Sequence, residues 1–130
     1  MIKVYVAGAY SDDNVLGVLR NIGRGEQEAA NLFSMGYAPF TPWHDKDFIL
    51  KNPYAKFDVK QFQEYSMEWL RLCDVVLIVP NVKGLKDWKH SKGTLAEIEE
   101  ANKLKIPVVF SFEQLLNMFP IEVDTTQLFG

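Results

Sequence analysis

Short apolar runs alternate along the chain with longer amphipathic stretches. The clearest runs are IKVYVA at 2–7, CDVVLIVP at 73–80 and KIPVVFS at 105–111, and YAPFTP at 37–42 is a weaker fourth that Pro42 ends. Each run is rich in β-branched residues and apolar at successive positions, as in parallel strands covered by helices on both faces. We therefore predict four strands of a mostly parallel sheet.

The stretches between these runs have helical spacing of apolar residues, so helices are predicted within 14–36, 59–73, 94–105 and 112–119. Gly36 is a suitable C-terminal stop for the first of them. Gly23 and Gly25 are expected to break its first half into a loop or separate turn. Trp69 is expected in the core. The segment 43–58 has no clean period, and we expect a long excursion over the strand edges.

This order of elements predicts an α/β fold of the flavodoxin or Rossmann-like kind. It would be a three-layer sandwich with a mostly parallel sheet of four or five strands and right-handed crossovers. At 130 residues the chain is long enough to bury a core, and one domain spanning 1–130 is expected. The last residues, 120–130, are interpreted either as a final edge strand or as a tail that packs on a partner subunit.

Composition and charge narrow the classes of function. About a quarter of the residues are charged and the formal net charge is −3, which does not favour binding to a nucleic-acid polymer or a membrane surface. Cys73 is the sole cysteine, so no intrachain disulfide can form. The sequence shows neither a signal-peptide pattern nor a membrane span, and a cytoplasmic location is expected. His44, His90 and Cys73 lack metal-binding spacing, so no metal site is expected.

Polar residues follow the first predicted strand, where an open α/β sheet binds its ligands. Gly8 either forms a turn or lets the backbone approach a ligand, and Tyr10 and Ser11 are polar groups just beyond it. The loop has neither the dinucleotide-binding glycine fingerprint nor a P-loop. Tyr10 and Ser11 are therefore candidate binding residues for a small molecule.

The stretch HSKGTLAEIEEA, 90–101, has two interpretations. Thr94 as N-cap with Glu97 three residues later would form a capping box, which stabilises the helix and needs no ligand. Alternatively, Ser91, Gly93 and Thr94 cradle a phosphate at the helix N-terminus. The helix field would then favour an ionised Glu97, which suits a nucleophile.

Three segments together resemble the nucleoside 2-deoxyribosyltransferase-like superfamily, which includes the 2′-deoxynucleoside 5′-phosphate N-hydrolases. They are VYVAGAYS at 4–11, SMEWLRLCDVVLIVP at 66–80 and SKGTLAEIEEANKLKIPVV at 91–109, in the family's order. The family's S-x-G-x-x-x-E element matches Ser91, Gly93 and Glu97. The resemblance implies that Glu97 attacks the anomeric carbon and that Ser91 holds a 5′-phosphate. It also implies that Tyr5 and Gly8 line the sugar pocket, and that the chain forms a homodimer or larger homo-oligomer through the helix at 58–72. No metal or organic cofactor is implied.

The sequence departs from the family where nucleotide hydrolases carry an aspartate in D-x-E-W-L. Here Ser66 occupies that position, and a hydroxyl can hydrogen-bond but cannot act as a comparable acid. Neighbouring acids that could replace the aspartate are Glu64, Asp45, Asp47 and Asp58. Three functions stay open: an N-glycosidase or base transferase acting on a (deoxy)nucleoside 5′-monophosphate, a non-catalytic nucleotide-binding or sensing module, and an assembly domain in which Glu97 only caps a helix.

Overall fold

A computed structural model describes residues 1–80 and 87–121 of the chain. Their elements, in order, are β1 (Lys3–Ala7), α1 (Val15–Met35), β2 (Ala38–Phe40), the 3-10 helix η1 (Pro42–Asp45), α2 (Lys46–Lys51), α3 (Val59–Leu70), β3 (Val75–Ile78), the 3-10 helix η2 (Trp88–His90), α4 (Lys92–Lys103), β4 (Val108–Val109) and α5 (Phe112–Met118). The strands form a parallel sheet in the order β2-β1-β3-β4. The predicted α/β sandwich is confirmed. The possible edge strand at 120–130 lies almost wholly outside the described residues.

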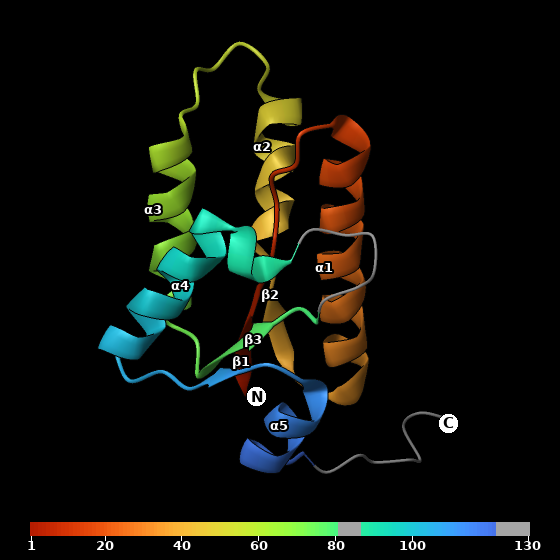
Figure 1. The fold of residues 1–130 in the computed structure, drawn as a ribbon, viewed down its shortest axis with the longest axis vertical. Coiled ribbons are helices and arrows are strands. Elements are labelled where there is room, and N and C mark those ends of the chain that lie inside the picture. The colour runs from red at the N-terminus through yellow and green to blue at the C-terminus, as the bar shows by residue number, and fades with distance from the viewer. Residues whose placement is uncertain (81–86, 122–130) are drawn as a thin grey trace.

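The alternation of side chains along β1 divides the core into two layers. Val4 and Val6 pack with residues of α1 and α5 on one face of the sheet. Tyr5 and Ala7 pack on the other face with residues of α3 and α4. Successive side chains of a strand point to opposite faces, so the sheet is covered on both sides and its strands are apolar throughout. Figure 1 shows α1 on one side of the sheet and α3 with α4 on the other.

The first helix is continuous, so the predicted break at Gly23 and Gly25 is wrong. α1 runs from Val15 to Met35, and it ends as predicted at Gly36, whose φ of 103° is left-handed. Gly25 is explained by packing, because a Cβ there would lie 2.5 Å from the Trp43 ring. The glycine therefore lets the indole approach the helix backbone. None of the described helices is long and apolar enough to cross a lipid bilayer.

This difference between the two glycines gives a matched pair of substitutions. Gly25→Ala should destabilise the protein by about 1–3 kcal/mol, because the added methyl group overlaps buried Trp43. Gly23→Ala should stabilise it by up to about 1 kcal/mol, because a Cβ there has no neighbour within 4 Å and alanine favours a helix. Denaturant unfolding of both variants measures the sign of each change in the free energy of unfolding. Equal effects of the two substitutions would show that the indole does not require Gly25.

The segment after β2 is more ordered than the sequence predicts. Instead of an irregular excursion it begins with η1 and α2, and Trp43 of η1 is buried at 1% exposure. The Trp43 indole Nε1 donates a hydrogen bond to the Ala9 carbonyl at 3.2 Å, and His44 Nε2 lies 3.1 Å from Tyr65 Oη on α3. These contacts hold η1 between the loop after β1 and α3. Trp69, which we expected in the core, is 44% exposed.

Candidate functional site

Tyr5, Ser66 and Glu97 meet on the face of the sheet that α3 and α4 cover. Tyr5 is fully buried in β1, and its hydroxyl faces both the Glu97 carboxyl group of α4 and the Ser66 hydroxyl of α3. Tyr5 Oη and Glu97 Oε2 are nevertheless both shielded from solvent without a hydrogen bond of standard geometry. The contact between them is therefore loose. Buried polar atoms are usually paired, so the exception at Oε2 marks Glu97 as a candidate functional group.

The environment of Glu97 favours its protonated form. Burial raises the pKa of Glu97 from 4.5 to about 8, an effect that the Tyr5 hydroxyl partly offsets and the negative charge of Asp45 reinforces. The prediction that the helix field keeps Glu97 ionised is wrong, because removing the carboxylate from water outweighs it. Glu97 thus carries a proton at neutral pH in the ligand-free protein.

The start of α4 is capped by Ser91, so the predicted capping box of Thr94 and Glu97 is wrong. Ser91 Oγ accepts hydrogen bonds from the Thr94 amide at 3.3 Å and from the Thr94 hydroxyl at 2.9 Å. Thr94 itself is fully buried inside the first turn. Glu97 therefore does not take part in capping α4, and the purely structural interpretation of this residue no longer applies.

A second buried acid lies beyond the ends of β1 and β2. Asp45 is 7% exposed, and the Tyr10 hydroxyl interacts with its carboxyl group. Burial raises the pKa of Asp45, and burial together with Asp45 raises the pKa of Tyr10 to about 12. Of the four acids that could replace the missing aspartate, Asp45 alone is buried, whereas Glu64, Asp47 and Asp58 are exposed.

The other predicted residues are more scattered. Gly8 packs tightly against protein, since a Cβ there would lie 3.2 Å from Val79 and 3.3 Å from Trp43. Ser11 is exposed in the loop that leads to α1. Gly93 lies in the first turn of α4, where a Cβ would have no neighbour within 4 Å. The described residues hold no group of three histidine, cysteine, aspartate or glutamate side chains suited to a metal ion.

The sequence did not single out an aromatic cluster beside Tyr5. The Phe40 ring stacks on Tyr5 at 5.6 Å and on Trp69 at 5.3 Å, and Phe48 meets Tyr65 edge-on at 5.5 Å. Trp69 and Phe48 are 44% and 40% exposed, so part of this aromatic surface faces solvent. Its members come from β2, α2 and α3, and no local motif links them.

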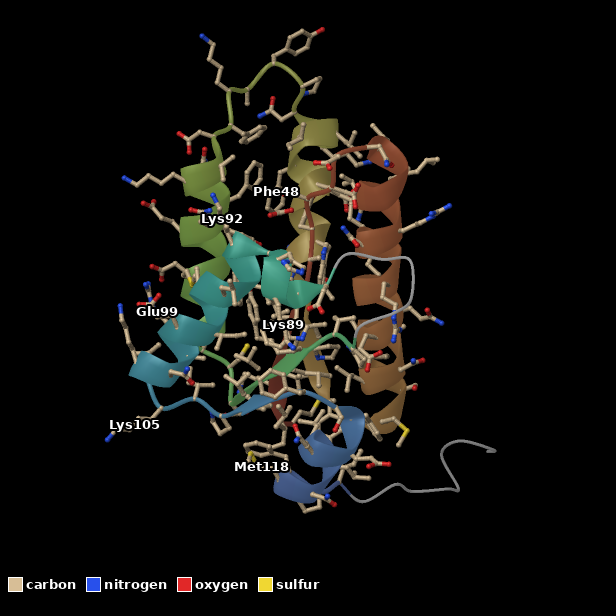
Figure 2. The ribbon with its side chains drawn as sticks, in the orientation of Figure 1. Phe48, Lys89, Lys92, Glu99, Lys105 and Met118 are labelled. Atoms are coloured by element: carbon tan, nitrogen blue, oxygen red, sulfur yellow. The ribbon has the colours of Figure 1, made fainter. Side chains whose placement is uncertain are left out.

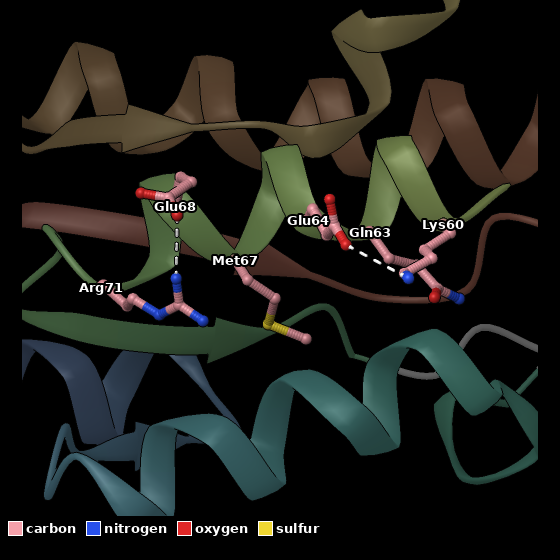
Figure 3. A pocket seen from close by; sticks show the side chains of 6 residues that line it. All are labelled: Lys60, Gln63, Glu64, Met67, Glu68 and Arg71. Atoms are coloured by element: carbon pink, nitrogen blue, oxygen red, sulfur yellow. Dashed lines mark hydrogen bonds and ion pairs between the residues drawn. The ribbon is translucent and has the colours of Figure 1, made fainter. Parts of the chain in front are cut away.

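A surface hollow of about 360 Å³ lies along α3, lined by Lys60, Gln63, Glu64, Met67, Glu68 and Arg71. Its charged side chains pair with one another, Lys60 with Glu64 at 3.9 Å and Arg71 with Glu68 at 3.0 Å (Figure 3). Neither Tyr5 nor Glu97 borders this hollow. Exposed ion pairs of this kind contribute little free energy, so these charges do not mark a functional site. We therefore do not place the site in this hollow.

Positive charge gathers at the start of α4. Figure 2 shows Lys89 in η2 and Lys92 at the first position of α4. Both are exposed, and the first turn carries no acidic residue. Helix N-termini favour anions, and these two ammonium groups strengthen that preference.

Comparison with known proteins identifies the fold. The chain superposes on a 2-deoxyribosyltransferase from the psychrotolerant bacterium Bacillus psychrosaccharolyticus, described as a biocatalyst for the synthesis of antiviral and antitumoral nucleosides. The TM-score is 0.52 at 18% sequence identity, covering 82% of this chain and 69% of the transferase. No family model matches the sequence, and neither does any curated protein in the comparison. The deoxyribosyltransferase-like fold suggested by the three sequence segments is thus confirmed.

Proposed function

We propose that this protein cleaves the N-glycosidic bond of a (deoxy)nucleoside 5′-monophosphate, with Glu97 as the nucleophile. The observation that carries the proposal is the Glu97 carboxyl group, buried at 8% exposure, with Oε2 unpaired and Tyr5 beside it. A buried acid with an unpaired oxygen costs stability, and its place on this fold suits attack on a sugar.

The proposed chemistry has two steps. Glu97 in its ionised form attacks the anomeric carbon, and the base leaves as a covalent glycosyl-enzyme forms. Water then resolves this intermediate in a hydrolase, or a second base does so in a transferase. The Tyr5 hydroxyl supports the ionised form, because its interaction lowers the pKa of Glu97.

The geometry of Ser91 supports a phosphate-binding role. Its Oγ already accepts two hydrogen bonds from Thr94, so its own O–H remains to donate to a ligand. A donating hydroxyl of this kind favours a ligand atom that accepts hydrogen bonds, such as a phosphate oxygen. Thr94 contributes by holding Ser91, and Lys89 and Lys92 supply positive charge nearby. The aromatic surface of Phe48 and Trp69 offers a face on which a base can stack.

Two observations favour a second candidate, a non-catalytic nucleotide-binding or sensing module. Ser66 stands where the family resemblance expects an aspartate, so the acid that assists base departure is missing from that position. Burial also raises the pKa of Glu97 to about 8, which disfavours the ionised nucleophile at neutral pH. Either function is compatible with assembly into a homodimer or larger homo-oligomer, which size-exclusion chromatography with light scattering would test.

A panel experiment separates the candidates. Purified protein is mixed with nucleoside 5′-monophosphates, in ribose and deoxyribose forms, and with the matching nucleosides. We expect calorimetric binding of at least one monophosphate in preference to its nucleoside, and release of free base measured by chromatography. Binding without base release would support the sensing module, and the absence of both would contradict each candidate.

A further inference from the structure

Asp45 lies in a segment anchored on two sides. Trp43, two residues before it, donates its indole N–H to the Ala9 carbonyl of the loop after β1. His44, immediately before it, contacts Tyr65 of α3, the neighbour of Ser66 in sequence, with 3.1 Å between Nε2 and Oη. These contacts place Asp45 between the loop after β1 and the part of α3 that carries Ser66.

The pairing of β1 with β2 brings Tyr10 and Asp45 together. Tyr5 pairs with Phe40 in the parallel ladder. β1 ends at Ala7 and β2 at Phe40, and the two segments that follow leave the sheet at its carboxyl edge, where α/β proteins bind ligands. Tyr10 and Asp45 lie in these two segments, and the Tyr10 hydroxyl interacts with the Asp45 carboxyl group.

Structural roles account for only part of this buried acid. Asp45 precedes α2 without a standard capping hydrogen bond, and its carboxyl group interacts with the Lys46 backbone and the Tyr10 hydroxyl. A carboxyl group at 7% exposure costs stability unless it is paired or held for a purpose.

The ring of His44 meets the Phe40 ring at 5.2 Å, and Phe40 stacks on Tyr5 at 5.6 Å, so the segment that carries Asp45 borders the Tyr5 side of the site. The charge of Asp45 also raises the pKa of Glu97.

We propose that Asp45 is the proton donor for the leaving base, and so supplies the carboxyl group that Ser66 cannot. This inference rests on the proposed function, because it assigns the second acid of the same reaction. Asp45 reaches the site from the segment after β2, whereas the family resemblance places the aspartate on the helix that here carries Ser66.

The proposed steps balance in protons and electrons. As a Glu97 oxygen bonds to the anomeric carbon, the carbon–nitrogen bond breaks, its electron pair goes to the base, and the Asp45 proton moves to a base nitrogen. Asp45 is left as a carboxylate. It then takes a proton from the water that attacks the same carbon, and the electron pair of the carbon–oxygen bond returns to Glu97.

This sequence requires one proton shared by two acids. Neighbouring buried carboxyl groups resist double ionisation, and burial raises the pKa of both Asp45 and Glu97. In the ligand-free protein the proton resides mainly on Glu97. Positive charge developing on the sugar would favour an ionised Glu97 and leave the proton on Asp45. The other groups that act on Asp45 are Tyr10, His44 and Lys46.

The test compares leaving groups that do and do not need a proton. Asp45→Asn is assayed with the nucleotide that the panel identifies and with the 4-nitrophenyl glycoside of 2-deoxyribose 5-phosphate, whose nitrophenolate leaves unprotonated. We expect kcat/KM for the nucleotide to fall by about 10²-fold or more, and kcat/KM for the nitrophenyl glycoside to stay close to wild type. Exposed Asp47→Asn, two residues away, should change neither value.

The outcomes separate this inference from the proposed function. An Asp45→Asn variant that loses neither activity, or loses both equally, overturns the proton-donor role while the function stands. A wild-type protein that cleaves neither compound overturns both. If Asp45→Asn does not fold, Tyr10→Phe serves instead. Loss of its hydroxyl raises the pKa of Asp45. Because Glu97 has the higher pKa of the two acids in the free protein, Asp45 sets the acid limb of kcat/KM, and that limb should move to higher pH. An acid limb that does not move contradicts the proposal.

Discussion

Replacing Glu97 by glutamine should lower base release from the preferred nucleoside 5′-monophosphate by at least about 10³-fold. The amide has nearly the shape of the acid but cannot form the glycosyl ester, because it lacks a nucleophilic carboxylate. Binding of the nucleotide should persist, since phosphate contacts at Ser91 and stacking on the aromatic surface do not use Glu97. Single-turnover chromatography of released base, beside calorimetry of binding, measures the two effects separately.

The matched control for this substitution is Glu99→Gln. Glu99 lies on the same helix and its carboxylate is exposed, 3.7 Å from Lys103. The control should leave turnover unchanged, because an exposed helical ion pair contributes little. Full turnover in Glu97→Gln would refute the nucleophile assignment and would favour the sensing module.

The same substitution should make the protein more stable, by an amount that grows with pH. Burial holds the pKa of Glu97 near 8, against an ordinary value of 4.5 in the unfolded chain. Between these two values the folded state binds a proton that the unfolded state has released, so wild-type stability falls as pH rises. The slope from this one group is about 1.4 kcal/mol per pH unit, and the whole loss is on the order of 4–5 kcal/mol.

Glutamine does not titrate, so the stability of Glu97→Gln does not decrease with pH in this way. Its advantage over the wild type should be small near pH 4.5, increase through neutral pH and level off above pH 8, following the pKa of Glu97. Urea unfolding of both proteins at pH 5, 6.5 and 8.5 measures the trend. A difference that does not depend on pH would mean that Glu97 titrates as an ordinary surface carboxylate does.

The fold could be predicted from the sequence because its signals are local. Apolar β-branched runs mark strands whose two faces are both covered, and Gly36 ends α1 where a left-handed residue is required. The need for glycine at position 25 could not be predicted this way. It comes from the indole of Trp43, eighteen residues later, which contacts Gly25 only in the folded chain. The sequence alone does not distinguish a glycine that breaks a helix from one that lets a neighbouring side chain approach the backbone.

The site was less accessible to sequence reasoning. Glu97 stood out through its spacing from Ser91, yet its protonation depends on burial, which no local pattern encodes. Ser91 and Thr94 are both good capping residues, and the actual start of α4 decides between them. Asp45 was one of four possible acids, and the parallel register of β1 and β2, with the anchor at Trp43, is what separates it from the exposed three.

The division of the core by β1 has a practical consequence for engineering this chain. Tyr5, Ser66 and Glu97 lie on one side of the sheet, whereas Leu32 and Leu115 lie in the layer on the opposite side. Within the described residues, that rear layer touches the site only at the sheet edge, through Trp43, which anchors the segment of Asp45, and through Tyr10. Substitutions in well-separated places add nearly independently. Substitutions in the rear layer away from Trp43 and Tyr10 should therefore change stability with little effect on the reaction rate.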